Sequence, residues 1–227
     1  MGADARTGHR KMPKEECPVC RAPSAPFHVA ADGRDYRRCS RCAATFLHAA
    51  QLPAVTAEYM HYLLHDNDPA DSGYRQFLEP LARPLLARLP PAQSGLDYGC
   101  GPGPALACML REAGHDVALY DPFFHDDPGV LERTYDFVVC SEVAEHFHRP
   151  AEEFSRLDGL LKPGGWLGIM TGILTDDERF TDWHYRRDPT HVVFYRPETF
   201  AHIARRHRWH PEFPAENVVL FRKDAQP

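Results

Sequence analysis

The sequence predicts an α/β protein with a doubly wound sheet, preceded by a small module that cysteines hold together. From residue 95 onward, short apolar strands alternate with helical segments, and a glycine-rich turn follows the first of these strands. Ahead of this region, four of the seven cysteines form two C-x2-C pairs. The chain has 227 residues, which is enough for one domain with an appendage.

The composition is that of an ordinary globular protein, with 43% hydrophobic and 26% charged residues. No apolar run approaches the roughly 18 residues of a membrane span, so we expect no membrane partner. The first sixteen residues are polar and lack the apolar core of a signal peptide, which predicts a cytoplasmic protein. In that reducing setting the cysteines are expected to be ligands or core residues rather than disulfides.

The charge is unevenly distributed along the chain. Residues 1–48 hold nine Lys and Arg against five Asp and Glu, a balance of +4. Because the net charge of the whole chain is −6, the remaining residues carry −10. An acidic body disfavours nonspecific binding to nucleic acid, which depends on clustered basic residues. The basic first segment keeps that partner in consideration.

The four paired cysteines predict a zinc-ribbon-like module over residues 1–50. Eighteen residues separate the two pairs, which is a zinc-ribbon spacing. Four thiolates close a tetrahedron around Zn²⁺ and leave no position for water, so the metal is expected to be structural. A hairpin turned at Asp32-Gly33 is expected between the pairs. The predicted ligands are Cys17, Cys20, Cys39 and Cys42.

A helical linker or cap is predicted over residues 51–93. Apolar residues recur at three- and four-residue spacing in the second half of this stretch. Pro80 and Pro84 interrupt the pattern and predict a kink or two shorter helices. Residues 62–69 end in helix breakers, so we expect a loop there that covers a ligand of the main domain.

The main domain, residues 94–227, begins with a βαβ unit. A strand at 96–98 leads into a glycine turn, a helix at 105–113 and a second strand at 116–121. Glycines at such a turn let a ligand approach the backbone, and an acidic residue ending the second strand suits ribose hydroxyls. Pro104 stands where a dinucleotide fingerprint requires its third glycine, which makes hydride transfer with a nicotinamide cofactor the weaker alternative.

The run Asp97-Tyr98-Gly99-Cys100-Gly101-Pro102-Gly103 resembles the first motif of class I S-adenosylmethionine-dependent methyltransferases. Residues 135–143 and 160–170 are similar to the fourth and fifth strands of that family, in the family's order. The resemblance implies S-adenosylmethionine as cofactor. It implies the following cofactor-binding residues: Asp97, Gly99, Gly101, Gly103, Asp121, Pro122, Phe123, Ser141, Glu142 and Val143.

The same resemblance implies a Rossmann-like three-layer sandwich with a mostly parallel sheet and an antiparallel last strand at 218–221. The whole chain looks like bacterial methyltransferases that carry a short zinc-binding segment ahead of the catalytic domain. One departure is the short stretch 122–135, where the family fits a helix, a strand and another helix. A shortened strand around Val130-Leu131 is expected there. The adenine pocket is then either more open than usual or closed by nearby aromatic residues.

Residues 180–191 form a polar, aromatic-rich segment after the fifth strand, at the edge where doubly wound proteins place their ligands. Trp183, His184 and Tyr185 are predicted to bind the substrate. His191 is the first candidate for a catalytic base, and His146, just past the fourth strand, is the second. The alternative is that His191 only hydrogen-bonds its loop and that His146 caps a helix.

These observations predict a methyltransferase acting on a small-molecule acceptor. The first alternative is an RNA-modifying methyltransferase that holds its substrate with the basic module. The acidic body and the absence of an Asn/Asp-Pro-Pro-Tyr/Phe motif disfavour it. The second alternative is a binding protein that keeps the cofactor site without turnover.

Overall fold

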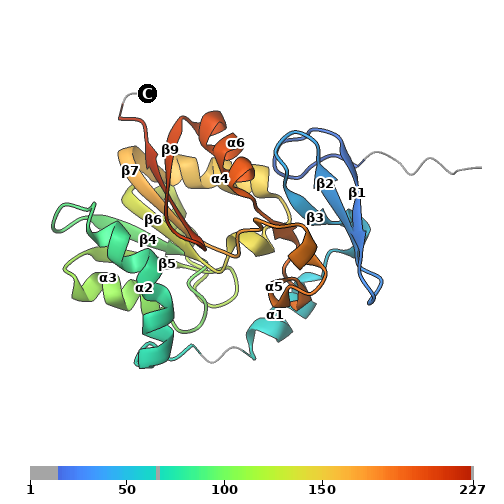
Figure 1. Cartoon of the computed structure of the whole chain (residues 1–227). Helices are drawn as coiled ribbons and strands as arrows, with labels where there is room; N and C mark the ends of the chain where they lie inside the picture. Colours follow the sequence, from blue (N-terminus) through green and yellow to red (C-terminus); the bar gives the residue numbers. More distant parts are fainter. Residues whose placement is uncertain (1–14, 65–66, 226–227) are drawn as a thin grey trace, which may run out of the picture.

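The computed structural model describes residues 15–64 and 67–225, which form two sheets that lie side by side in Figure 1. The larger sheet contains six strands in the order β5-β4-β6-β7-β10-β9. Their bounds are β4 Ser94–Tyr98, β5 Asp116–Tyr120, β6 Tyr135–Ser141, β7 Leu161–Met170, β9 Trp209–Ala215 and β10 Val218–Lys223.

Strands β5, β4, β6 and β7 are parallel, whereas β10 is antiparallel to both β7 and β9. The predicted antiparallel last strand is therefore confirmed. Strand β9 was not expected from the sequence, because its burial pattern is mostly exposed and lacks the apolar signal of a strand. It forms the outer edge of the sheet by pairing with β10.

Helices cover both faces of this sheet, as a three-layer sandwich requires. Helices α2 (Ser72–Leu86) and α3 (Ala105–Glu112) pack on one face through an apolar cluster that includes Leu81 and Leu110. Helices α4 (Pro150–Leu160) and α6 (Pro197–His207) cover the other face, with Phe154 and Phe200 in its core. The predicted Rossmann-like fold is confirmed.

The stretch predicted to be helical before the core divides into α1 (Val55–Tyr62) and α2. The division falls at residues 63–71 and not at the prolines, since α2 continues through Pro80 and Pro84. Pro80 has no backbone N–H, so the carbonyl of Gln76 lacks its usual hydrogen-bond donor within the helix. Both residues are exposed. Water can therefore replace the lost helical bond there.

The strand expected around Val130-Leu131 is absent from the described residues. Residues Pro128–Glu132 instead form a short 3-10 helix, whose first turn is capped by the side chain of Asp127. Pro128 and Gly129 favour this turn over an extended edge strand. Strand β5 is therefore the edge of the sheet on this side.

The segment that contains Cys17, Cys20, Cys39 and Cys42, here called the cysteine-bound segment, forms the second sheet. Its strands are β1 (Ser24–Val29), β2 (Asp35–Cys39) and β3 (Thr45–Leu47). The predicted hairpin is present, since β1 and β2 pair antiparallel. A fourth strand, β8 (Val193–Phe194), comes from the main domain and pairs with β3. The cysteine-bound segment and the main domain therefore share this sheet. The cysteine-bound segment packs against the side of the main domain that carries α4 and α6 (Figure 1).

Two backbone-directed hydrogen bonds attach the cysteine turns to the helices. The carbonyl of Pro18 accepts from the Ala151 N–H at 3.1 Å, and the carbonyl of Cys42 accepts from the Thr199 hydroxyl at 2.8 Å. Within residues 15–64 and 67–225, no helix is long and apolar enough to cross a membrane.

Candidate active site

A cavity of about 870 Å³ opens at the carboxyl ends of β4, β5 and β6. Parallel sheets of this kind place ligands at that edge, because the loops that follow the strands converge there. The cavity brings together most of the predicted site residues. Those that line it are Asp97, Gly99, Gly101, Asp121, Pro122, Phe123, Ser141, Glu142, Val143, His146, His184, Tyr185 and His191. Gly103 and Trp183 do not line it.

The carboxylate of Asp121 connects the end of β5 to the glycine turn. Its Oδ2 accepts the backbone N–H of Gly101 at 3.0 Å, and its Oδ1 accepts those of Phe123 and Phe124 at 2.8 and 3.1 Å. A carboxylate has about four acceptor positions, so one position on Oδ2 remains for a ligand hydroxyl. Asp97 is buried below the same turn, and burial raises its pKa to about 7.

Two glycines of the turn are required by close packing. Gly99 has φ of +80°, and a Cβ there would lie 2.6 Å from the Val143 side chain. At Gly103 a Cβ would overlap the carbonyl oxygen of Asn67. The loop after α1 therefore rests on the glycine turn, and Asn67 itself lines the cavity. Asn67 is thus the part of the expected loop 62–69 that lies against the glycine turn, while residues 65–66 lie outside the described residues.

The end of β6 carries two polar residues that face the cavity. The Ser141 hydroxyl is buried and has no hydrogen-bond partner among the described atoms, so its donor and acceptor positions are unused there. Glu142 has φ of +53°, a conformation that side chains other than glycine rarely adopt and that concentrates at functional sites. Burial, followed by the neighbouring Glu145, raises the pKa of Glu142 to about 9.

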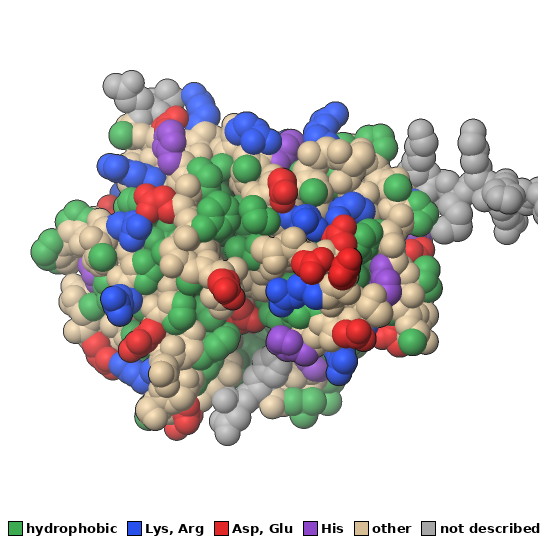
Figure 2. All heavy atoms as spheres, in the orientation of Figure 1, with side chains coloured by type: hydrophobic (Ala, Val, Ile, Leu, Met, Phe, Trp, Pro, Cys, Tyr) green, Lys and Arg blue, Asp and Glu red, His purple; other side chains and the backbone are tan. Residues whose placement is uncertain are grey.

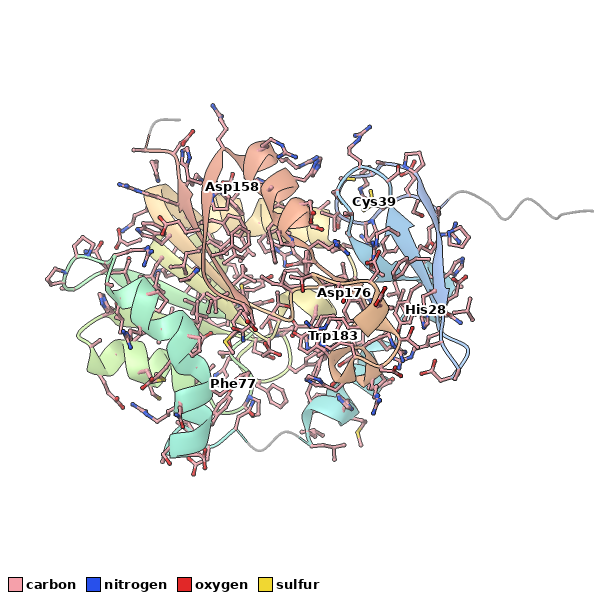
Figure 3. All side chains as sticks on the ribbon, in the orientation of Figure 1. His28, Cys39, Phe77, Asp158, Asp176 and Trp183 are labelled. Atoms are coloured by element: carbon pink, nitrogen blue, oxygen red, sulfur yellow. The ribbon has the colours of Figure 1, made fainter. Side chains whose placement is uncertain are left out.

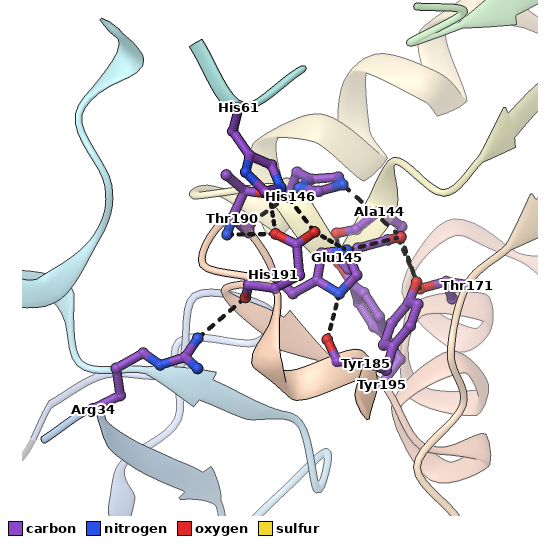
Figure 4. A network of polar contacts seen from close by, with 11 residues as sticks. Arg34, His61, Ala144, Glu145, His146, Thr171, Tyr185, Thr190, His191 and Tyr195 are labelled. Atoms are coloured by element: carbon purple, nitrogen blue, oxygen red, sulfur yellow. Dashed lines mark hydrogen bonds and ion pairs between the residues drawn. The ribbon is translucent and has the colours of Figure 1, made fainter. Parts of the chain in front are cut away.

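At the other end of the cavity, Glu145 lies between His146 and His191 (Figure 4). Its Oε1 is 3.9 Å from Nε2 of His191 and 4.0 Å from Nε2 of His146. The Thr171 hydroxyl donates to Oε2 at 2.9 Å, and the Tyr185 hydroxyl donates to Oε1. Glu145 is fully buried.

Backbone carbonyls determine which nitrogen of each histidine carries the proton. Nδ1 of His146 is 3.0 Å from the Thr190 carbonyl, and Nδ1 of His191 is 2.7 Å from the Tyr185 carbonyl (Figure 4). Because a carbonyl oxygen only accepts, each Nδ1 is the donor and each neutral ring keeps a lone pair on Nε2. Burial lowers the pKa of His191, which favours the neutral ring.

The three residues predicted to bind substrate differ in position. Tyr185, in the short helix α5 (His184–Arg187), lies on the cavity wall with His184. Trp183 is buried beside α5 (Figure 3), with its ring 5.1 Å from Tyr185 and 5.8 Å from Phe194 between centroids. Trp183 thus supports the wall from behind.

Aromatic side chains close the cavity near the short stretch after β5. Tyr59 and Tyr62 of α1 lie 5.6 Å from Phe123 between ring centroids, and Tyr59 lies 6.0 Å from Phe124. Aromatic side chains therefore pack together on this side of the cavity. Local sequence patterns did not identify Tyr59 or Tyr62, because their contact with residues 123–124 arises only when α1 packs against the stretch that follows β5.

The four predicted metal ligands form a buried cluster in the first segment, where Figure 3 labels Cys39. Sγ of Cys17 is 3.6 Å from Sγ of Cys42, and Sγ of Cys20 is 3.3 Å from Sγ of Cys39. Sulfurs at the corners of a tetrahedron with metal bonds of about 2.3 Å are about 3.8 Å apart. The donor set therefore fits a four-thiolate metal site.

Sequence reasoning did not include Glu145 among the site residues. Its signal was a carboxylate beside His146 directly after an apolar strand, which is an unfavourable place for a charge without a partner. Asp188 was also missed. Its Oδ2 lies 3.9 Å from Nε2 of His191 and 3.0 Å from Nε2 of His61.

Comparisons with known proteins agree with this architecture. A family model described as a methyltransferase domain matches residues 70–208, more than half of the chain. The fold is similar to that of the Burkholderia thailandensis 1,6-didemethyltoxoflavin-N1-methyltransferase, solved with 1,6-didemethyltoxoflavin and S-adenosylhomocysteine. The match has a TM-score of 0.50 and 18% identity and covers 88% of this chain and 99% of that one.

An O-methyltransferase family protein from the same organism matches with a TM-score of 0.49 and 18% identity, over 70% of this chain and 62% of that chain. Human N-acetylserotonin methyltransferase in complex with S-adenosylmethionine matches with a TM-score of 0.46 and 16% identity, over 66% and 53% of the two chains. A comparison with curated protein sequences finds no significant match.

Proposed function

Because the chain belongs to the class I S-adenosylmethionine-dependent methyltransferases, we propose that it transfers the methyl group of S-adenosylmethionine to a small-molecule acceptor bound beside His146 and His191. The observation that carries this proposal is the continuous cavity of about 870 Å³ between the glycine turn and the two histidines. Ligand pockets span about 300 to 1,000 Å³, so this volume suits a cofactor together with a small acceptor.

In this proposal the cofactor lies along the glycine turn, with its ribose at Asp121. The remaining acceptor position on Oδ2 receives a ribose hydroxyl, while the aromatic rings of Phe123 and Tyr62, which both line the cavity, flank the adenine. Ser141 and Glu142 contact the amino-acid end, since they lie between the turn and the histidines.

The chemistry asked of the chain is modest, because the sulfonium already makes methyl transfer favourable. The protein has to hold donor and acceptor in line and exclude water, and the closed aromatic wall serves both needs. A hydroxyl acceptor also has to lose a proton. His191 and His146 both present an Nε2 lone pair for this purpose, so they are the proposed catalytic bases.

For the cysteine cluster we propose structural Zn²⁺. Four buried thiolates leave no coordination position for a substrate, so the ion stabilises the segment and does not react. The segment holds the strand that follows His191, because the Leu47 N–H donates to the Val192 carbonyl at 2.8 Å. Arg34 of the same segment donates to the Asp188 carbonyl at 3.1 Å. The zinc thereby supports the acceptor end of the cavity.

The RNA-modifying alternative gains no support from the charges of the first segment. Arg21 pairs with Glu152, Arg37 with Glu15 and Arg38 with Asp177, so these cations are already neutralised by carboxylates. On the face visible in Figure 2, Lys and Arg side chains alternate with Asp and Glu and do not form one basic patch. Arg6, Arg10, Lys11 and Lys14 lie outside the described residues.

Calorimetric titration with S-adenosylmethionine and with its demethylated product tests the proposal. We expect both to bind, and we expect Gly99→Ala to abolish binding because the added methyl group meets Val143. Binding of neither compound to the folded wild-type chain would refute the cofactor assignment. A binding protein without turnover would bind both, yet it would show no product with any of a panel of hydroxyl- and amine-bearing small molecules.

A further inference from the structure

The acceptor end of the cavity brings one carboxylate and two imidazoles to a common point. We propose that Glu145, His146 and His191 bind a divalent transition-metal cation, in a second metal site separate from the four cysteines. The inference rests on the proposed function, because it assigns the site that receives the acceptor.

The separations between the ligand atoms suit a small cation. Oε1 of Glu145 is 3.9 and 4.0 Å from the two Nε2 atoms, and all three atoms lie within 4.8 Å of one another. Around a tetrahedral cation with metal bonds of about 2.1 Å, two ligand atoms are about 3.4 Å apart. The separations here exceed this by about 0.5 to 1.4 Å, so the three side chains have to move closer together by that amount when an ion binds.

The orientation of both rings is the stronger observation. Metal-binding histidines generally donate their second ring N–H to a carbonyl or carboxylate, which directs the other nitrogen at the ion. Here the Thr190 carbonyl holds Nδ1 of His146 and the Tyr185 carbonyl holds Nδ1 of His191. A single catalytic base needs only one imidazole with a free Nε2 lone pair. Two imidazoles whose Nε2 atoms both lie near one oxygen of Glu145 can instead chelate a metal ion.

The charge around Glu145 also favours a cation. Among the described residues, the ion-pair contacts of Glu145 are with the two histidines alone, although its side chain is fully buried. Asp188 adds a second carboxylate, 3.9 Å from the same Nε2 of His191. Buried negative charge without a lysine or arginine partner is costly, and a bound divalent cation would offset it.

Two imidazoles and one carboxylate suit Mn²⁺, Fe²⁺, Co²⁺ or Zn²⁺, and three protein ligands leave positions open toward the cavity. The acceptor is then a molecule with a hydroxyl that coordinates the cation. Its O–H proton passes to solvent, and an oxygen lone pair forms the new O–C bond. The C–S electron pair returns to sulfur, which leaves S-adenosylhomocysteine. When the cation is bound, it activates the hydroxyl of the acceptor, and the hydroxyl proton is not transferred directly to His191.

Manganese binding followed by electron paramagnetic resonance tests the site, because Mn²⁺ prefers oxygen and imidazole ligands to the thiolates of the other cluster. Full-length protein dialysed free of loosely held metal is titrated with Mn²⁺. We expect one bound ion per chain, with affinity at least about tenfold lower in His146→Ala and His191→Ala. His148→Ala is the matched control, since His148 lines the same cavity but pairs with Glu58 at 3.0 Å.

Equal Mn²⁺ binding by wild type and by the double variant His146→Ala/His191→Ala would overturn the inference, as would weak binding by both. Titration of the same samples with S-adenosylmethionine separates the two proposals. Cofactor binding without Mn²⁺ binding removes the metal site and leaves the methyltransferase assignment. Mn²⁺ binding without cofactor binding keeps the metal site and removes the methyltransferase assignment. Glu145→Gln, which keeps the shape of the side chain, is expected to weaken Mn²⁺ binding while S-adenosylmethionine still binds.

Discussion

The Oδ2 atom of Asp121 accepts the backbone N–H of Gly101 at 3.0 Å, which ties the end of β5 to the turn that follows β4. An acidic residue that the sequence marks as a ribose contact is therefore also a structural support for the glycine turn. The same carboxylate has three backbone donors, so its orientation is settled before any ligand arrives. Such preorganisation reduces the entropy lost on binding.

Replacing Asp121 by alanine is expected to lower affinity for S-adenosylmethionine at least tenfold, or about 1.4 kcal/mol. The variant loses the ribose acceptor and frees the turn from β5. Calorimetry measures the affinity, with Asp126→Ala as control, because Asp126 is exposed and belongs to the same loop. Equal affinities of the two variants would remove Asp121 from the cofactor site.

Gly103→Ala is expected to reduce the free energy of unfolding by about 1 to 3 kcal/mol, because the added methyl group overlaps the Asn67 carbonyl and displaces its loop. Urea denaturation measures the change. Gly159→Ala, in α4, is the control, since a Cβ there meets no atom within 4 Å. That variant is expected to be neutral or more stable, and the same result for Gly103→Ala would contradict the close packing of Gly103 against Asn67.

Cys39→Ser is expected to release the zinc and to lower the thermal midpoint by several degrees, since loss of a structural metal removes the force that holds the segment together. S-adenosylmethionine binding should change much less, because the glycine turn belongs to the other sheet. Scanning calorimetry and metal analysis provide the readouts. Cys108→Ser is the control, because Cys108 is half-buried outside the cluster. Unchanged zinc content in Cys39→Ser would contradict the four-cysteine assignment.

Asp97 predicts a pH dependence of stability. Burial raises its pKa to about 7 in the folded chain, against about 3.9 in the unfolded chain. Between these values the folded state binds the extra proton, so the free energy of unfolding falls as pH rises through the window and is then level. Asp97→Asn cannot ionise, and its carbonyl still accepts the Ala107 N–H.

Urea denaturation of wild type and Asp97→Asn between pH 4 and pH 8 measures this effect. The stability of wild type relative to the variant is expected to fall with rising pH by an amount on the order of 2 to 4 kcal/mol. Groups common to both proteins cancel in the difference. Parallel curves across this range would show that Asp97 keeps an ordinary pKa.

The sequence by itself determined the order of the main elements and the identity of the cofactor turn. The glycines and Asp97 belong to one short turn, and the cysteines to two tight knuckles, so local spacing specifies their chemistry. Strand β10 lies at the continuous apolar run of residues 218–221, where the family resemblance implies a last strand. The sequence also selected His146 and His191, through their positions after strands.

Only the tertiary structure decided what surrounds these histidines. Glu145 and His191 lie far apart in the chain and meet because β8 joins the sheet of the cysteine-bound segment and turns residues 185–191 over the end of β6. Trp183, which looks locally like a ligand contact, is instead covered by Phe194. The spacing of residues along the chain predicts which side chains are neighbours within one helix or strand. Contacts between distant segments depend on which faces are buried together, and that is fixed only when the whole core packs.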